Sequence, residues 1–399
     1  MADNVLLMSL DELSGRYQKG TLSPVEVARA HLARLAKLEP VLNAFQIVDE
    51  AGALAAARAS EARWRSGAAL GKLDGAPATI KDNVDLMGFP TRSGSTTTPA
   101  AAAAADAPVV ARLREAGAVF LGKTTTPEFG WKGITDSSLR GAATRNPWQP
   151  AHSSGGSSGG AAAAVVAGIG TIAFGNDGGG SIRIPAAFCG AFGIKPSFGR
   201  VPHHPLESPF ATVVAGGPIT RTVQDAATTL AVMARPDERD WYSIPPPRSG
   251  WLADLAPKVS GVRFAWSPDL GGAKPDAEVM AVLAPALAVL RRAGAAVESV
   301  GPVIDPLKPV FTDFWLAGWL CQPVARDPGG PLGGNRSRLA GPGEAGAGDR
   351  RGPGERRPGG APATAQPGGR AVPNPPSAAD PGHPACGAAG RHCLSQPGL

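Results

Sequence analysis

Apolar side chains recur at helical spacing through the first 70 residues of the chain. Between Val25 and Leu35 they return every three or four positions, and Ser23 and Pro24 in front of them supply an N-cap residue and a proline at the first helical position. An alanine-rich segment over about residues 49–66 then ends before Gly67. The pattern therefore predicts a helical N-terminal segment, residues 1–70.

Beyond residue 70, short apolar runs alternate with longer amphipathic segments. Short runs are typical of buried strands, and the longer segments are typical of helices. This alternation predicts an α/β fold with a mixed, mostly parallel sheet that is covered by helices on both faces. The predicted strands are 77–80, 119–121, 262–266 and 296–300, and the predicted helices are 109–116, 223–234, 276–293 and 306–320.

The composition changes at residue 321. The 79 residues from Cys321 to Leu399 include 18 Gly, 14 Pro, 13 Ala and 9 Arg, and they contain no Phe, Trp, Tyr, Ile, Met or Lys. Their six Leu and Val cannot bury enough apolar surface to offset the roughly 1–2 kcal/mol that ordering each residue costs. We therefore expect a disordered tail over 321–399. A gene read out of frame is a second interpretation, because the codons of these four residue types are rich in G and C, and resequencing codons 320–325 tests it.

The net charge of +6 belongs mainly to that tail. The tail carries nine arginines and five acidic residues, a net charge of +4, which leaves only +2 on residues 1–320. This part of the sequence has no basic block with interleaved aromatic residues, so we expect no nucleic-acid partner.

The N-terminal residues and the apolar segments indicate a cytoplasmic protein. Asp3, Asp11 and Glu12 stand where a secretory signal would carry a basic leader and an apolar run. The small apolar stretch 161–175 is too short and too rich in Ala and Gly to span a bilayer. Cys189 has no second cysteine before residue 321, which argues against a disulfide framework and a CxxC metal site.

Two glycine-rich loops follow each other in the middle of the chain. The first, residues 155–160, reads GGSSGG, and the second reads DGGGS from Asp177 to Ser181. A flexible linker is the plain interpretation, but linkers do not usually come as two coordinated loops within a hydrophobic segment. A phosphate-binding loop is another, although neither GxxxxGK[ST] nor GxGxxG occurs here. Ser181 beside three glycines suits acyl transfer, because a nucleophilic hydroxyl and several N–H donors share one small space.

These loops resemble the signature of the amidase signature family of serine hydrolases. After GGSSGG, the pattern D-x-GGSIR-x-PAAFCG-x-x-G-x-KP over residues 177–196 is its most specific part. The similarity covers about residues 5–320 and also takes in 81–83, 122–124 with Glu128, 146–148 and 217–225. The resemblance implies the amidase signature fold, incomplete at its C-terminal end because the similarity stops near residues 320–323.

The resemblance also implies a Ser-cisSer-Lys triad that needs no metal or organic cofactor. Ser181 would be the nucleophile, Ser157 the bridging serine after a cis peptide bond, and Lys81 the base. Lys81 can accept a proton only when it is neutral, and burial would disfavour its charged form. The implied oxyanion hole consists of the backbone N–H groups of Gly178, Gly179, Gly180 and Ser181.

Other reactive residues near the signature have plainer interpretations. Asp177 and Arg183 are spaced to form an ion pair that supports the nucleophile loop, which we favour over direct contact with substrate. Cys189 lies in an apolar setting that is typical of a core residue rather than a nucleophile. Lys123 and Lys195 are rival bases by residue type, and only the resemblance favours Lys81. No histidine has the spacing of a Ser-His-Asp triad.

The sequence therefore predicts an amidase that converts a small-molecule amide to an acid and ammonia or an amine. The expected domains are an amidase domain over 1–320, with parts 1–70, 71–235 (the catalytic core) and 236–320, followed by the tail 321–399. Two alternatives stay open, namely the A-type subunit of a tRNA-dependent glutamine amidotransferase and a truncated, inactive scaffold. We expect no membrane partner. Whether the chain forms a homodimer and which amide it cleaves stay open.

Overall fold

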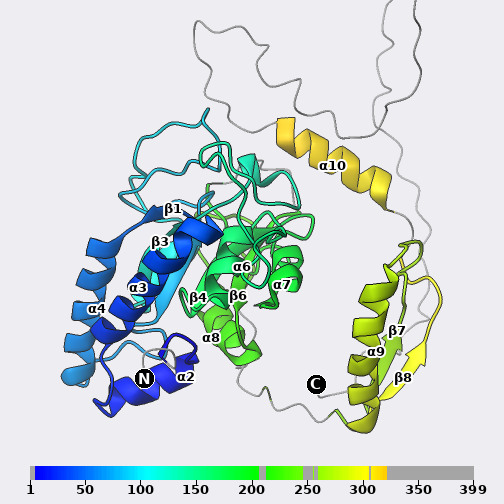
Figure 1. Ribbon diagram of the computed structural model, residues 1–399, viewed down its shortest axis with the longest axis horizontal. Helices are drawn as coiled ribbons and strands as arrows, with labels where there is room; N and C mark the ends of the chain where they lie inside the picture. The colour runs from blue at the N-terminus through cyan, green and yellow to red at the C-terminus, as the bar shows by residue number, and fades with distance from the viewer. Residues whose placement is uncertain (1–4, 206–212, 246–254, 256–258, 305–306, 321–399) are drawn as a thin grey trace, which may run out of the picture. The chain divides into compact units, whose positions relative to one another are not determined.

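A six-stranded mixed sheet forms the centre of the computed structural model, which describes residues 5–205, 213–245, 255, 259–304 and 307–320 (Figure 1). The strands are β1 (Phe45–Val48), β2 (Pro77–Lys81), β3 (Val119–Thr124), β4 (Ile172–Asp177), β5 (Phe192–Gly193) and β6 (Ala215–Thr220). They lie in the order β1-β3-β2-β4-β6-β5. β2 runs parallel to both β3 and β4, and the outer pairings are antiparallel. The mixed sheet is confirmed, but parallel pairing is not the majority that the sequence predicted: two of the five strand pairings are parallel, and both involve the central strand β2.

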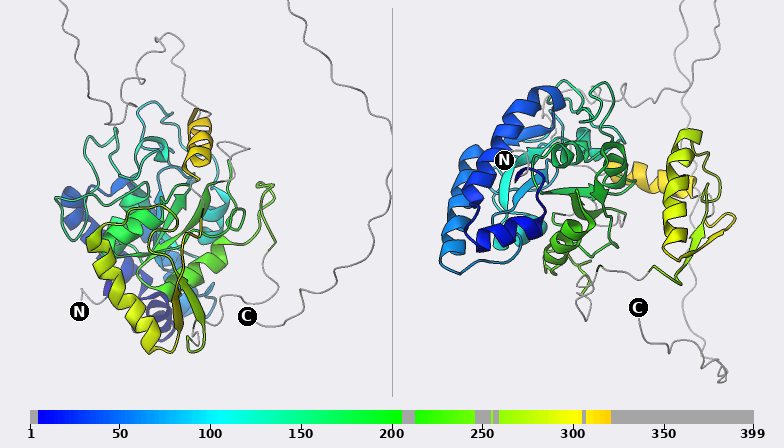
Figure 2. Two further views of the ribbon diagram at one scale, coloured as in Figure 1. Left: turned by 90° about the vertical axis from the view of Figure 1, so that its right-hand side faces the viewer. Right: turned by 60° about the horizontal axis from the view of Figure 1, so that its bottom comes forward.

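Helices cover both faces of this sheet, as predicted (Figures 1 and 2). One face packs against α3 (Pro24–Leu42), α4 (Glu50–Arg65) and α6 (Gly159–Val166), and the other against α5 (Pro108–Glu115) and α8 (Val223–Met233). The side-chain alternation of β3 separates the two cores, because Leu121 joins the first and Phe120 joins the second. α2 (Leu10–Gln18) contacts α4, α7 (Arg183–Cys189) contacts α6, and the short 3-10 helix η1 (Glu128–Gly130) follows β3.

The two predicted helices of the N-terminal segment begin where the sequence indicated, α3 at the predicted cap Ser23 and α4 after Asp49. The Ser23 hydroxyl accepts a hydrogen bond from Val25 N at 3.0 Å, and the Glu26 carboxylate accepts one from Ser23 N at 2.8 Å. These bonds form a capping box in front of α3. At the start of α4 the Asp49 carboxylate accepts from Gly52 N at 2.9 Å. Both predicted N-terminal helices are therefore confirmed.

Strand β6 is one element that the pattern of the sequence did not predict. Its run Gly216-Gly217-Pro218 has low strand propensity. Tertiary packing selects these glycines, because a Cβ on Gly216 would lie 2.8 Å from the Phe174 ring and one on Gly217 would collide with the backbone carbonyl oxygen of Ile194. The strand forms because pairing with β4 and β5 outweighs its low local preference.

Residues 263–299 form a βαβ unit. β7 (Arg263–Trp266) pairs in parallel with β8 (Ala296–Ser299), and α9 (Ala277–Arg292) connects them (Figure 2). Together with α10 (Lys308–Leu320), these elements confirm the predicted alternation after residue 260. The predicted tail, 321–399, lies outside the described residues. Within the described ranges no helix has the length and apolar character that a membrane span requires.

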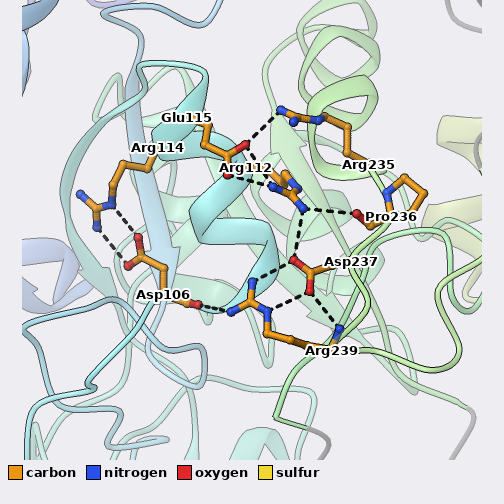
Figure 3. A network of polar contacts seen from close by, with 8 residues as sticks. All are labelled: Asp106, Arg112, Arg114, Glu115, Arg235, Pro236, Asp237 and Arg239. Carbon is orange, nitrogen blue, oxygen red and sulfur yellow. Dashed lines mark hydrogen bonds and ion pairs between the residues drawn. The ribbon is translucent and has the colours of Figure 1, made fainter.

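An ion-pair network joins α5 to the segment after α8 (Figure 3). The carboxylate of Asp237, 8% exposed, accepts two hydrogen bonds from the Arg239 guanidinium at 2.8 Å and one from Arg112 Nη2 at 3.3 Å. Arg112 also binds Glu115 at 2.8 Å. The hydrogen bonds from Arg239 are the main cause that lowers the pKa of Asp237 to about 2.

We expect Asp237→Ala to lower the free energy of unfolding at pH 7 by about 2 kcal/mol, because it removes several hydrogen bonds to a charged group. The pKa of Asp237 is lower in the folded chain than the unfolded value of about 3.9. Its carboxylate therefore stabilises the fold above about pH 4, and this contribution disappears as the pH falls towards 2. Urea unfolding should show less than half of the pH 7 effect at about pH 2.5. Glu238→Ala is the exposed control, and an equal loss at both pH values would contradict this account.

Candidate active site

Both glycine-rich loops lie at the carboxyl edge of the parallel strands. Lys81 is the last residue of β2, and Asn176 precedes the last residue of β4, which runs parallel to β2. The loop 155–160 leads into α6, and the loop 177–181 connects β4 with α7. The carboxyl ends of parallel strands commonly carry the binding site of an α/β sheet. The fold thus brings Lys81 and the two predicted glycine-rich loops to one edge of the sheet.

Lys81 is buried against one of the two predicted serines. Its Nζ lies 2.7 Å from Ser157 Oγ and 2.6 Å from Asn176 Oδ1. Lys81 is 0% exposed and Ser157 is 1% exposed. Removal of an ammonium group from water disfavours its charged form, which is the condition that a lysine base needs.

One backbone hydrogen bond joins the two serine loops, and the Thr135 side chain fixes the first of them. The peptide bond between Gly156 and Ser157 is cis, and Ser158 N donates to Ser181 O at 3.1 Å. The Thr135 hydroxyl donates to the carbonyl of Gly155 at 2.9 Å and accepts from the N–H of Gly159 at 3.1 Å. Ser181 itself is buried. The predicted nucleophile and bridging serine therefore lie on loops that contact each other directly.

Asp177 organises the turn that carries Ser181. Its carboxylate accepts from Gly180 N at 2.7 Å and from Ile182 N at 3.1 Å, and it forms a bidentate ion pair with Arg183 at 2.8 and 2.9 Å. Burial alone raises the pKa of Asp177, but the hydrogen bonds from Arg183, Ile182 and Gly180 outweigh it and hold the pKa below its ordinary value. The ion pair expected from the sequence is present, and it joins the buried Asp177 carboxylate to an Arg183 side chain that is 54% exposed.

Three of the four predicted oxyanion donors keep their N–H groups available. Gly180 N donates to Asp177, so this N–H does not point at a substrate in this structure. For the N–H groups of Gly178, Gly179 and Ser181, the described part of the chain offers no acceptor. Gly180 has a φ of +117° and a Cβ there would lie 2.8 Å from Ile184 Cδ1, so the turn requires glycine.

The rival candidates lie in other environments. Lys123 Nζ donates to Pro90 O at 2.7 Å and pairs with Asp82 at 3.3 Å, whereas Lys195 Nζ donates to Pro196 O at 2.9 Å. Burial raises the pKa of Cys189 to about 12, and its thiol donates to Ser154 O at 3.4 Å, so it is an unreactive core residue. Lys81 is the candidate lysine that the structure places against Ser157.

Sequence reasoning missed Asn176 and Thr135. Asn176 lies 95 positions after Lys81, and Thr135 lies 24 positions before Gly159, so each contact depends on the tertiary fold. The position of Asn176 just before the pattern DGGGS was the available signal, since parallel strands end at one edge. The described residues contain no group of three or more His, Cys, Asp or Glu that could hold a metal ion.

Comparisons with known sequences found a matching family model and similar proteins. A family model described as Amidase matches residues 26–318. An acylamidase from Rhodococcus erythropolis is 41% identical over 285 residues, which are 71% of this chain and 60% of that protein. A glutamyl-tRNA(Gln) amidotransferase subunit from Myxococcus xanthus, of the A type, is 40% identical over 280 residues, which are 70% of this chain and 57% of that protein.

Solved structures with similar folds include two amidases. A bacterial aryl acylamidase of the amidase signature family has a TM-score of 0.72 at 32% identity, covering 77% of this chain and 64% of that chain. The peptide amidase from Stenotrophomonas maltophilia has a TM-score of 0.68 at 34% identity, covering 74% of this chain and 62% of that chain. The chain thus spans less than two thirds of the length of these relatives. Because the family match extends over most of the chain and includes the whole site, this chain belongs to the amidase signature family.

Proposed function

We propose that the chain hydrolyses a carboxamide through an acyl-enzyme on Ser181. The observation that carries this proposal is the 2.7 Å approach of Lys81 Nζ to Ser157 Oγ, on a loop that is hydrogen-bonded to Ser181. A serine hydroxyl is a weak nucleophile until a neighbouring base takes its proton. Lys81, when neutral, is that base, and Ser157 passes the proton to it.

Two steps complete the reaction. In the first, Ser181 Oγ bonds to the amide carbon while its proton moves through Ser157 Oγ to Lys81 Nζ. The C–N bond then breaks, and the amine leaves with the proton that Lys81 returns. In the second, water bonds to the ester carbon while one of its protons moves through Ser157 Oγ to Lys81 Nζ. The bond to Ser181 Oγ then breaks, and Lys81 returns the proton to this oxygen, which releases the acid and free Ser181. The N–H groups of Gly178, Gly179 and Ser181 would stabilise the oxyanion in both steps.

A second candidate function is glutamine amidotransfer, in which glutamine is the amide substrate. The amidotransferase subunit from Myxococcus xanthus is 40% identical over 280 residues, so the same acyl-enzyme chemistry on glutamine, with transfer of ammonia, is an alternative. A scaffold without activity is the third. Release of acid and ammonia from a panel of simple amides and glutamine separates the three functions.

The acyl-enzyme has a direct chemical test. Added hydroxylamine should compete with water for the acyl group and give a hydroxamate. When acylation limits the rate, hydroxylamine should leave the rate of amine release unchanged. A folded chain that releases neither ammonia nor an amine from any amide would contradict the proposal.

Asn176 is proposed as a positioning residue for Lys81. Asn176→Asp would place a carboxylate about 2.6 Å from Nζ and favour the charged lysine. We expect kcat at pH 7 to fall by roughly 100-fold or more and the pH profile to move upwards, because a higher pH is then needed to neutralise the base. Asn176→Ala removes one hydrogen bond without adding charge, so it should cost only about tenfold and leave the profile in place. Identical pH profiles for the two variants would argue against this role.

A further inference from the structure

Three aromatic side chains from distant parts of the sequence form one stack. The Trp131 and Trp315 ring centroids are 5.6 Å apart with planes inclined by 24°, and the Phe311 and Trp315 centroids are 5.4 Å apart at 22°. Trp131 directly follows η1, whereas Phe311 and Trp315 lie one turn apart on α10. We call Trp131, Trp315 and Phe311 the aromatic stack.

The aromatic stack lies directly beside the proposed oxyanion donors. A Cβ on Gly179 would lie 3.0 Å from Phe311 Cζ, and one on Gly178 would lie 3.0 Å from Trp315 Cζ3. At the other end of the stack, Trp131 follows Gly130, where a Cβ would lie 3.3 Å from Ser157 Oγ. The stack therefore extends from the loop of Ser181 to the segment beside Ser157.

The rings are only partly covered by the protein. Phe311 is 38% exposed, and Trp131 and Trp315 are partly exposed. Exposed apolar rings beside a reactive site are typical of a binding surface. Nearly parallel rings favour a further flat group in offset stacking, and none of the three carries a charge.

From these contacts we propose that the aromatic stack selects amides that carry a flat aromatic group. This inference rests on the proposed amidase function and names its substrate class. An aromatic ring would continue the stack while the amide carbonyl meets the N–H groups of Gly178 and Gly179. Glutamine has a charged carboxylate, for which the three uncharged rings offer no cation, so the stack disfavours it.

Two fluorophosphonates that differ only in a phenyl or an ethyl group test the inference on the full chain. We expect the phenyl probe to label the wild-type chain about tenfold faster, which corresponds to about 1.4 kcal/mol. Trp131→Ala and Phe311→Ala should each bring this ratio close to one, and Trp131→Phe should restore it. Phe314→Ala, on the same helix and 49% exposed, is the matched control and should keep the ratio.

Binding to the unreactive Ser181→Ala chain keeps this inference separate from the proposed function. Benzamide should bind about tenfold more tightly than acetamide in calorimetry, and Trp131→Ala in that background should remove the difference. Labelling of the wild type by both probes at equal rates, or a ratio that none of the variants changes, would overturn the aromatic site and leave the amidase proposal standing. Tighter benzamide binding without labelling by either probe would support the aromatic site and contradict the amidase proposal.

Discussion

Ser181→Ala is expected to reduce amide hydrolysis by roughly 10⁴-fold or more, the largest effect of any single change that we propose. The substitution removes the oxygen that would form the acyl-enzyme. It leaves the Ser158 N to Ser181 O hydrogen bond and the Asp177 contacts in place, because these involve backbone atoms or other side chains. Initial rates on a reactive anilide measure the loss.

The matched control is Ser197→Ala, since Ser197 is exposed on the surface. Both variants should unfold at the same urea concentration as the wild type within error. A Ser181→Ala chain that keeps more than a few per cent of the wild-type rate would show that another group performs the nucleophilic attack.

Lys81→Met should reduce kcat by roughly 10²–10⁴-fold, as expected when a general base is lost. Methionine keeps the apolar length of the side chain and removes the nitrogen that lies 2.7 Å from Ser157 Oγ. Rates across the pH range measure the effect, and the variant should lose the rise in activity with pH that deprotonation of the base causes.

Lys81→Arg distinguishes a base from a structural cation. Arginine keeps the donor groups and the charge but stays protonated in proteins, so it cannot accept a proton from Ser157. We expect it to be as inactive as Lys81→Met, whereas exposed Lys37→Met should be unaffected. Activity retained in Lys81→Arg, with only a raised KM, would contradict the role of Lys81 as base.

Local sequence signals predicted the elements that local interactions stabilise. The capping box of Ser23 and Glu26 starts α3 where the spacing indicated, and the buried run at residues 77–80 became β2. β6 escaped prediction because Gly216 and Gly217 are selected by contacts with the Phe174 ring and the Ile194 carbonyl oxygen, which lie more than twenty positions away in the chain. Contacts of that kind carry no periodic signal.

In the candidate site, too, the sequence predicted local features but not long-range contacts. Ser181 and its glycines are visible in the sequence as a loop suited to acyl transfer, but the choice of Lys81 over Lys123 came from the family resemblance. Spacing could not have selected Lys81, because its contact with Ser157 joins residues 76 positions apart. Nor could it show that Asp177 occupies the Gly180 N–H, or that Trp131 stacks on Trp315.

The two interpretations of residues 321–399 stay predictions. The family match ends at residue 318, close to the change of composition at residue 321. The disordered tail and the out-of-frame reading both concern residues outside the described part of the chain. Resequencing therefore comes before any assay in which this region is altered.

If Ser181 is the nucleophile of a serine amidase, a fluorophosphonate should modify it covalently. The full chain is treated with the probe, and intact mass and peptide mapping locate the adduct. We expect one adduct per chain, on Ser181, and none in Ser181→Ala. An adduct on another residue, or a folded chain that takes up no probe, would contradict this role of Ser181.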